Sequence, residues 1–160
     1  MMNIQALKLA IQRYIDENFV NYDYNVKCME FYQSVVCIEP DLLDCMEDTF
    51  SQTLFKLIKR KGVSETDCYK NANLDRRLFS KIRSNDDYQP RKSTVFALII
   101  GLKLDINEAE VLLDSAGYSI SHSIKLDIIM EYLIKKQIYD IVIVNEILYS
   151  FNCPLLGQTC

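Results

Sequence analysis

The sequence predicts an all-α protein whose centre is a pair of short helices joined by a tight turn. Three observations support this fold class. Hydrophobic residues make up 49% of the chain, yet it holds only four glycines and three prolines, a composition typical of a folded, helix-rich protein. The hydrophobic residues recur at helical spacing over most of the length. The stretch Cys68–Ser84, CYKNANLDRRLFSKIRS, combines helical spacing with a sharp turn and many basic side chains.

The first predicted element is an amphipathic helix over residues 3–20. Its hydrophobic residues share one stripe, at Ile4, Leu7, Ile11, Tyr14, Ile15 and Phe19. Such a stripe needs a partner surface, so the helix is expected to pack against another part of the protein. Residues 20–37 show no clean period. Residues 40–48 supply a proline and acidic side chains suited to a helix start, and the helix that follows is expected to end at Gly62.

Two short helices are predicted next. Ser64 is expected to cap the first, with Asp67 three residues later as a weak form of the capping box. Asn73 stands where the chain must turn sharply, because asparagine tolerates a positive φ better than other non-glycine residues. Asp75 follows as the cap of the second helix, over about residues 75–84, since its carboxylate can accept backbone N–H bonds. Two helices joined by a turn of three or four residues result.

The second of these helices has two different faces. At about 100° per residue, Leu78, Phe79 and Ile82 fall within an arc of about 100°. The opposite arc, of about 160°, carries Arg76, Arg77, Ser80, Lys81 and Arg83. One face is therefore expected to pack and the other to stay basic. A basic face of this kind is either an ordinary solvated surface or a surface that meets the phosphates and base edges of DNA.

The charge of the chain is unevenly distributed around this helix. The formal net charge is -4, but residues 50–103 hold 12 lysines and arginines against 5 acidic residues. Residues 1–49 hold 3 against 9, and residues 104–160 hold 3 against 8. A basic centre is the expected electrostatic signature of a protein that binds a polyanion, because the attraction depends on the local field. The acidic ends weaken that attraction.

A longer pattern surrounds the helix pair in residues 62–113. It runs Gly-hydrophobic-Ser, a helix, a turn, a second helix, a loop ending in Pro90, an apolar helix, and a further helix opened by Asp105 or Asn107. This pattern resembles the helix-turn-helix of the Cro and lambda-repressor type, the xenobiotic-response-element family, and covers about a third of the chain. The resemblance implies a repressor-like five-helix core. It places the hydrophobic positions of the helix pair at Cys68, Ala72, Leu74, Phe79 and Ile82.

The resemblance also implies which residues contact DNA. Base edges in the major groove would meet Arg76, Arg77, Ser80 and Lys81, with Asp75 at the helix start as its cap. The DNA backbone would be contacted by Lys56, Arg60, Lys61, Arg83, Arg91 and Lys92. Two residues depart from the family pattern. Tyr69 stands in place of the usual alanine where the two helices approach each other, and Asn73 in place of the usual turn glycine.

Two or more further helices are predicted after this core. Gly117 marks the end of a helix, and residues 123–136 have the spacing of an amphipathic helix. Residues 140–151 are rich in Val and Ile, which favour strands, but their hydrophobic spacing is helical and Asp140 is a suitable cap, so a helix is predicted. The run Asn73–Gly157 is also similar to the C-terminal module of a group of bacterial helix-turn-helix regulators.

These elements divide the chain into three predicted parts: an acidic N-terminal helical extension at 1–49, the helix-turn-helix core at 50–116, and a C-terminal helical extension packed on the core at 117–160. The extensions either enlarge the core or form a homodimer surface. A dimer would matter because repressor-like domains bind two half-sites about 34–36 Å apart. The predicted function is a sequence-specific transcriptional regulator that binds double-stranded DNA. The alternative is a protein-interaction adaptor that keeps the fold, does not read DNA, and docks a partner through its N- or C-terminal amphipathic helices.

Other classes of function find little support. His122 is the only histidine, and its serine neighbours indicate a polar helix entry rather than a catalytic group. No glycine-rich phosphate-binding motif is found, so neither an enzyme nor a cofactor is predicted. The six cysteines contain no C-x-x-C pair, which favours reduced, buried thiols over a metal site. No signal peptide and no apolar run of about 20 residues is found, so a cytoplasmic protein without a membrane span is expected.

Overall fold

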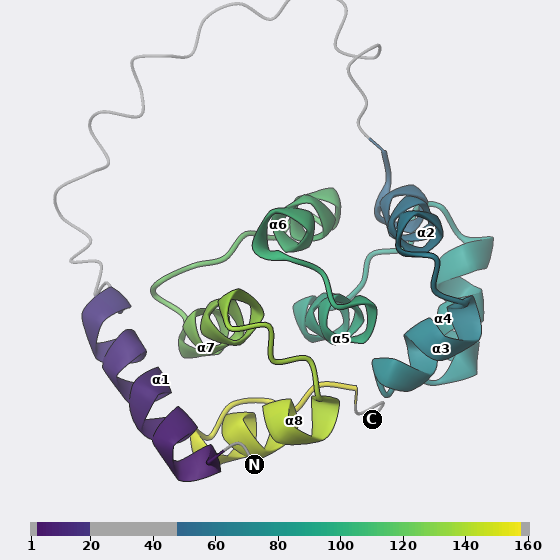
Figure 1. Cartoon of the computed structure of the whole chain (residues 1–160). Helices are drawn as coiled ribbons and strands as arrows, with labels where there is room; N and C mark the ends of the chain where they lie inside the picture. Colours follow the sequence, from purple (N-terminus) through teal and green to yellow (C-terminus); the bar gives the residue numbers. More distant parts are fainter. Residues whose placement is uncertain (1–2, 20–47, 158–160) are drawn as a thin grey trace, which may run out of the picture.

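The computed structural model describes residues 3–19 and 48–157, and all regular secondary structure in these two ranges is α-helical (Figure 1). In chain order the helices are α1 (Ile4–Asn18), α2 (Phe50–Lys61), α3 (Glu65–Asn71), α4 (Arg76–Ser84), α5 (Lys92–Leu102), α6 (Ile106–Ser115), α7 (Lys125–Lys135) and α8 (Ile141–Ser150). The predicted all-α fold class is confirmed for the described residues. The ambiguous stretch rich in Val and Ile is helix α8, as its spacing predicts.

Helix α5 is the centre of the packing. Every residue from Val95 to Leu102 is buried, because the run VFALIIGL is apolar on all sides of the helix, and a helix of that kind must be enclosed by neighbours. It contacts α3, α6 and α8, and Figure 1 shows these helices arranged around it. The apolar helix predicted after the loop that ends in Pro90 is therefore present as the core element of the protein.

Helices α3 and α5 approach each other closely at Gly101. A Cβ placed on this glycine would lie 2.8 Å from the backbone nitrogen of Ala72 and 2.9 Å from the carbonyl oxygen of Cys68. These are backbone atoms at the end of α3, and they cannot rotate away as a side chain can. The glycine therefore lets α3 lie directly on the central helix.

Helix α1 packs against α7, so the first helix of the chain covers a helix from its C-terminal part (Figure 1). Ile11 and Ile15 are buried, and the ring centroids of Tyr14 and Tyr132 lie 5.1 Å apart. The Tyr14 hydroxyl accepts a hydrogen bond from Lys135 Nζ at 3.1 Å. The partner surface that the hydrophobic stripe requires is therefore provided by α7.

Helix α2 begins later than the sequence predicts. The start signal lies in residues 40–48, yet Asp48 precedes the helix and Phe50 is its first residue. The reason is local, because the Thr49 side chain accepts the N–H of Gln52 while the Gln52 side chain accepts the N–H of Thr49. This capping box satisfies backbone groups that the acidic stretch was expected to serve. The predictions for the residues before Asp48, back to residue 20, lie outside the described part of the chain.

Several other predicted helix starts and ends agree with the structure. Ser64 caps α3 by accepting the N–H of Asp67 at 3.0 Å, and its hydroxyl donates to the Asp67 carboxylate at 2.6 Å. Asp105 opens α6 with a full capping box. Gly62 and Gly117 follow α2 and α6 with φ angles of 65° and 73°, in the left-handed region that glycine adopts without strain.

The C-terminal segment returns to the helix pair. Asp140 caps α8, and further along this helix Asn145 accepts the N–H of Leu156 at 2.8 Å and donates to its carbonyl oxygen at 3.0 Å. Leu156 is fully buried. The next residue, Gly157, lies against the turn between α3 and α4, where an added Cβ would be 2.6 Å from the Asn73 carbonyl oxygen. The end of the described chain thus supports the turn of the helix pair.

Candidate nucleic-acid interface

The turn between α3 and α4 has the predicted conformation. Asn73 has a φ of 52°, in the left-handed region that asparagine tolerates. The Leu74 N–H donates to the Tyr69 carbonyl oxygen at 2.8 Å and closes the turn. Asp75 then accepts the N–H of Arg77 at 2.6 Å and caps α4. These local bonds determine where α4 begins relative to α3.

Helix α4 has a buried face and a basic face. Phe79 and Ile82 are buried, with 3% and 0% of their surface exposed, and Leu78 is half-buried. The residues expected to contact bases are all exposed: Arg76, Arg77, Ser80 and Lys81. The hydrophobic positions expected from the helix-turn-helix pattern are all buried: Cys68, Ala72, Leu74, Phe79 and Ile82. The structure therefore brings the four candidates together on one outward face.

The cations of this face are available to a partner. Among the described residues, no carboxylate lies within ion-pair distance of Arg76, Arg77 or Lys81. The Lys81 ammonium lies 5.5 Å from the centre of the Tyr88 ring, a cation–π contact that leaves its charge uncompensated. An anion that binds here does not have to displace a carboxylate already in place.

Tyr69, which departs from the repressor pattern, lies between α3 and α4. Its ring is half-buried, and the centroid is 5.8 Å from that of Phe79. A hollow of about 460 Å³ opens beside it, and Arg76, Ser80 and Arg83 are among the residues that line it. Two of the residues expected to contact bases therefore border a hollow rather than a flat surface.

Most of the residues expected to contact the DNA backbone form ion pairs within the protein. The pairs are Lys56–Asp48, Arg60–Glu108, Lys61–Glu108, Arg83–Glu65 and Lys92–Asp127. Arg91, just before α5, is exposed and has no ion pair among the described residues. In the Lys56–Asp48 and Arg83–Glu65 pairs both side chains are exposed, and exposed pairs contribute only about 0–1 kcal/mol. Lys56 and Arg83 can therefore exchange a carboxylate for a phosphate at little cost.

Glu108 joins α6 to the end of α2. Its carboxylate accepts hydrogen bonds from Arg60 and, at 2.6 Å, from Lys61. It also accepts the N–H of Asp105 at 3.1 Å. Burial disfavours the charged form of Glu108, but the hydrogen bonds from the two cations outweigh this effect and lower its pKa to about 2. Arg60 and Lys61 thus help to hold α2 on α6.

We expect part of the acid sensitivity of the fold to come from Glu108. Its pKa of about 2 in the folded protein lies below the ordinary value of 4.5. The charged carboxylate therefore stabilises the fold above about pH 4.5, and this contribution is lost as the pH falls toward about 2. Urea midpoints measured from pH 7 to pH 3 should fall less steeply for Glu108→Gln than for the wild type. The exposed Glu110→Gln is the control, and equal slopes for all three proteins would contradict the pairing.

Lys92 binds a carboxylate in the core at the start of α5. Its Nζ donates to Asp127, which is fully buried, and to the Ser119 carbonyl oxygen at 2.6 Å. Asp127 also accepts the N–H of Ser121 at 2.8 Å. Its second oxygen, Oδ1, has no hydrogen-bond partner among the described residues. The pair ties α5 to α7 and to the segment before α7, which gives Lys92 a structural role.

Two partners of the basic helix were missed by the sequence reasoning. Tyr88 lies under Lys81, and Glu65, the first residue of α3, pairs with Arg83. The Arg83 guanidinium also lies 5.7 Å from the centre of the Phe55 ring. The hydrophobic period of the sequence does not predict these contacts, because they form only when the helices and loops pack together.

Cys68 and His122 are two further titratable groups whose surroundings the structure defines. Burial raises the pKa of the Cys68 thiol to about 12, so it is neutral near pH 7 and a poor nucleophile. His122 Nε2 lies 2.8 Å from the Glu131 carboxylate, which also pairs with Lys135. Within residues 3–19 and 48–157, no three His, Cys, Asp or Glu side chains gather as metal ligands. No helix in these ranges has the length and apolar character needed to cross a membrane.

Comparison of the chain with protein-family models, with curated proteins and with solved structures gave no match. The basis for a functional proposal is therefore the geometry and charge of the α3–α4 pair.

Proposed function

We propose that the protein is a DNA-binding transcriptional regulator whose helix α4 enters the major groove. The observation that carries this proposal is the outward face of α4, where Arg76, Arg77 and Lys81 are exposed and have no carboxylate partner among the described residues. The major groove is about 12 Å wide and admits an α-helix. The buried residues Phe79 and Ile82 anchor the opposite side of the helix.

The proposal gives each exposed residue a role. Arg76 and Arg77 lie in the first turn of α4, the part of a recognition helix that contacts base edges in helix-turn-helix proteins. An arginine can bond both O6 and N7 of guanine, which discriminates against the wrong base by about 1–3 kcal/mol. Ser80 and Lys81 follow one turn later and face the same way. Arg91 would contact a phosphate and so position the helix without reading sequence.

The charge of the surrounding chain supports the same function. Residues 50–103 hold 12 basic residues against 5 acidic ones. Arg60 and Lys61 form ion pairs with Glu108, and Lys92 forms one with Asp127. Arg76, Arg77 and Lys81 of α4 are among the cations of this segment that are exposed and form no ion pair among the described residues. Long-range attraction to a polyanion depends on such a local excess of positive charge.

Selection from a random-sequence duplex library tests this function. Wild-type protein is expected to enrich a defined sequence motif, and the variant Arg76→Ala/Arg77→Ala/Lys81→Ala is expected to enrich none. The charge-matched control is Arg13→Ala/Lys125→Ala/Lys136→Ala, which removes exposed cations from α1 and the ends of α7, away from α4 in Figure 1. It should enrich the wild-type motif. No motif with the wild type, or the same motif with the α4 variant, would exclude base reading by α4.

A protein-interaction adaptor is the second candidate, favoured by an apolar surface on α8. Val142 and Tyr149 are 71% and 75% exposed, and residues seven apart lie on the same side of a helix. The occupant of such a surface could be a second copy of the chain. If the adaptor function is correct, the protein binds no duplex DNA. Val142→Ser/Tyr149→Ser should then weaken the contact between two copies and lower the molar mass measured by light scattering.

A further inference from the structure

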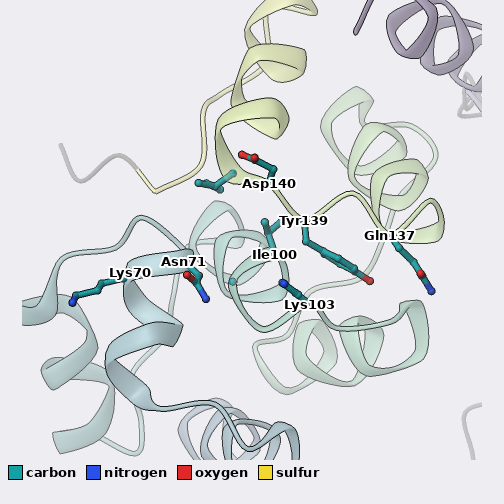
Figure 2. A pocket seen from close by; sticks show the side chains of 9 residues that line it. Lys70, Asn71, Ile100, Lys103, Gln137, Tyr139 and Asp140 are labelled. Carbon is teal, nitrogen blue, oxygen red and sulfur yellow. The ribbon is translucent and has the colours of Figure 1, made fainter. Parts of the chain in front are cut away.

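A cavity of about 550 Å³ lies where the helix pair meets the C-terminal helices (Figure 2). Its walls come from the end of α3, the end of α5 and the segment that joins α7 to α8. The polar side chains that line it are Lys70, Asn71, Lys103, Gln137, Tyr139 and Asp140. Figure 2 shows Asn71 and Lys103 near the middle of this group, with Lys70 and Gln137 at opposite edges.

Two of the lining residues have a backbone conformation that is unusual for their type. Lys103 and Gln137 have φ angles of 53° and 56°, in the left-handed region. They follow the ends of α5 and α7, at positions where glycine is the common residue because it has no Cβ. The other non-glycine residues with a positive φ in the described ranges are Asn73 and Asn152, and asparagine tolerates this conformation. Two long polar side chains are thus kept at strained positions in one cavity, and strain of this kind marks functional sites.

The cavity has an excess of positive charge. Lys70 and Lys103 are exposed and form no ion pair among the described residues. The carboxylate in the lining belongs to Asp140, which is engaged as the cap of α8. It accepts the N–H of Val142 at 2.9 Å and the N–H of Ile143 at 3.4 Å. The two ammonium groups therefore have no strong acceptor within the lining.

We propose that this cavity binds a small anion, a metabolite carrying a phosphate or a carboxylate, at the ammonium group of Lys103, with Lys70 at the edge of the cavity adding to its positive charge (Figure 2). Phosphate and carboxylate share the acceptor oxygens that ammonium groups bind. The amide groups of Asn71 and Gln137 can donate and accept hydrogen bonds, so they would hold the polar remainder of the ligand. Small-molecule sites have volumes of about 300–1,000 Å³, and the cavity lies within this range.

A ligand at this site would act on the helix pair. Lys70 and Asn71 are the last two residues of α3, and the turn that positions α4 follows directly. Lys103 follows the end of α5. A ligand held by Lys103 and the neighbouring Asn71 would join α5 to α3 and restrict the position of α4 (Figure 2). Binding itself does not depend on the proposed function, and only an effect of the ligand on DNA binding rests on it.

Thermal unfolding of the full chain, at constant ionic strength and without DNA, tests this site. The probes are inorganic phosphate and succinate. At least one is expected to raise the Tm of the wild type with a saturating dependence on concentration, and the probe that does so identifies the anionic group. In Lys70→Gln/Lys103→Gln the apparent Kd should rise about tenfold or more, since charge-assisted bonds are lost. The control Lys59→Gln/Lys125→Gln removes the same charge from exposed sites elsewhere and should respond as the wild type does.

Lys103→Gly separates loss of the site from loss of the fold. Glycine relieves the backbone strain at φ 53°, so this variant should melt at a higher temperature than the wild type and yet respond less to the probe. The proposal is overturned if neither probe raises the Tm of the wild type. It is also overturned if both lysine variants keep the wild-type response. Because no DNA is used, these outcomes leave the DNA-binding function to be judged separately.

Discussion

Lys92→Met is expected to destabilise the protein by about 3–5 kcal/mol, the cost of leaving a buried charge without its partner. Asp127 is fully buried, and Lys92 is the cation that pairs with it. Methionine preserves much of the length and apolar character of the lysine stem, so the substitution removes mainly the charge. The Asp127 carboxylate would then keep one hydrogen bond, from the Ser121 N–H at 2.8 Å. Small domains have a total stability of about 5–15 kcal/mol, so urea unfolding at pH 7 should detect a large loss.

Two further variants test the cause of this loss. Lys92→Met/Asp127→Asn replaces the unpaired charge with a neutral amide, which can still accept the Ser121 N–H, and should recover much of the stability. Lys125→Met changes an exposed lysine in the first turn of α7 and should alter the stability by only about 0.5 kcal/mol. If Lys92→Met had no larger effect than Lys125→Met, the buried pair would not be present in solution.

Gly101→Ala is expected to destabilise the protein by about 1–3 kcal/mol, the usual range for overpacking. A loss of stability would be informative, because alanine in a helix interior is ordinarily favoured over glycine by about 1 kcal/mol. The added Cβ would lie 2.8 Å from the Ala72 nitrogen, 2.9 Å from the Ala72 Cβ and 2.9 Å from the Cys68 carbonyl oxygen. Helix α3 must move to relieve these contacts, so the loss of packing should exceed the gain in helix propensity.

Calorimetry of Gly101→Ala and Ser93→Ala provides the comparison. Ser93 lies in the first turn of the same helix and is half-buried. Ser93→Ala should change the Tm little, whereas Gly101→Ala should lower it by several degrees. A loss of 1 kcal/mol in stability lowers the Tm by about 4–8 °C in a domain of 60–100 residues and by less in a larger one. A higher Tm for Gly101→Ala would mean that α3 does not lie on α5 at this glycine.

The sequence predicts the elements whose causes are local. Ser64, Asp75 and Asp140 each cap the helix expected of them, and Asp105 caps the helix for which Asp105 or Asn107 was expected. A cap depends on hydrogen bonds to residues two or three positions away. The left-handed turn at Asn73 is predicted for the same reason. The two faces of α4 follow from helical spacing alone, and the burial of α5 follows from an uninterrupted apolar run.

Features that depend on packing between distant segments are not visible in the sequence. The charge of Lys92 suggests a surface residue, but its neighbour in space is a buried aspartate. Arg60 and Lys61 both form ion pairs with Glu108 of α6, although no sequence pattern relates the end of α2 to this glutamate. Helix α2 starts later than the acidic stretch indicates, because that stretch and a capping box are competing start signals and the box at Thr49 determines the first turn.

The predicted division into parts at 1–49, 50–116 and 117–160 stays a prediction. Helix α1 of the first part packs against α7 of the last part, so the two extensions contact each other as well as the core. The sequence shows that α1 needs a partner surface, but a hydrophobic stripe does not say which surface it covers. The five-helix repressor core likewise stays an expectation, supported by five buried positions in the helix pair.

The claim that α4 binds DNA is tested most directly by the salt dependence of duplex binding, measured by fluorescence anisotropy from about 50 to 200 mM salt. The logarithm of the wild-type binding constant is expected to fall linearly with the logarithm of salt concentration, with a slope of about -0.9 for each phosphate neutralised. Arg76→Ala/Arg77→Ala/Lys81→Ala should bind more weakly at every salt concentration, because base contacts are lost, while Arg13→Ala/Lys125→Ala/Lys136→Ala should bind as the wild type does. Absence of binding at the lowest salt, or wild-type affinity in the α4 variant, would contradict DNA binding by α4.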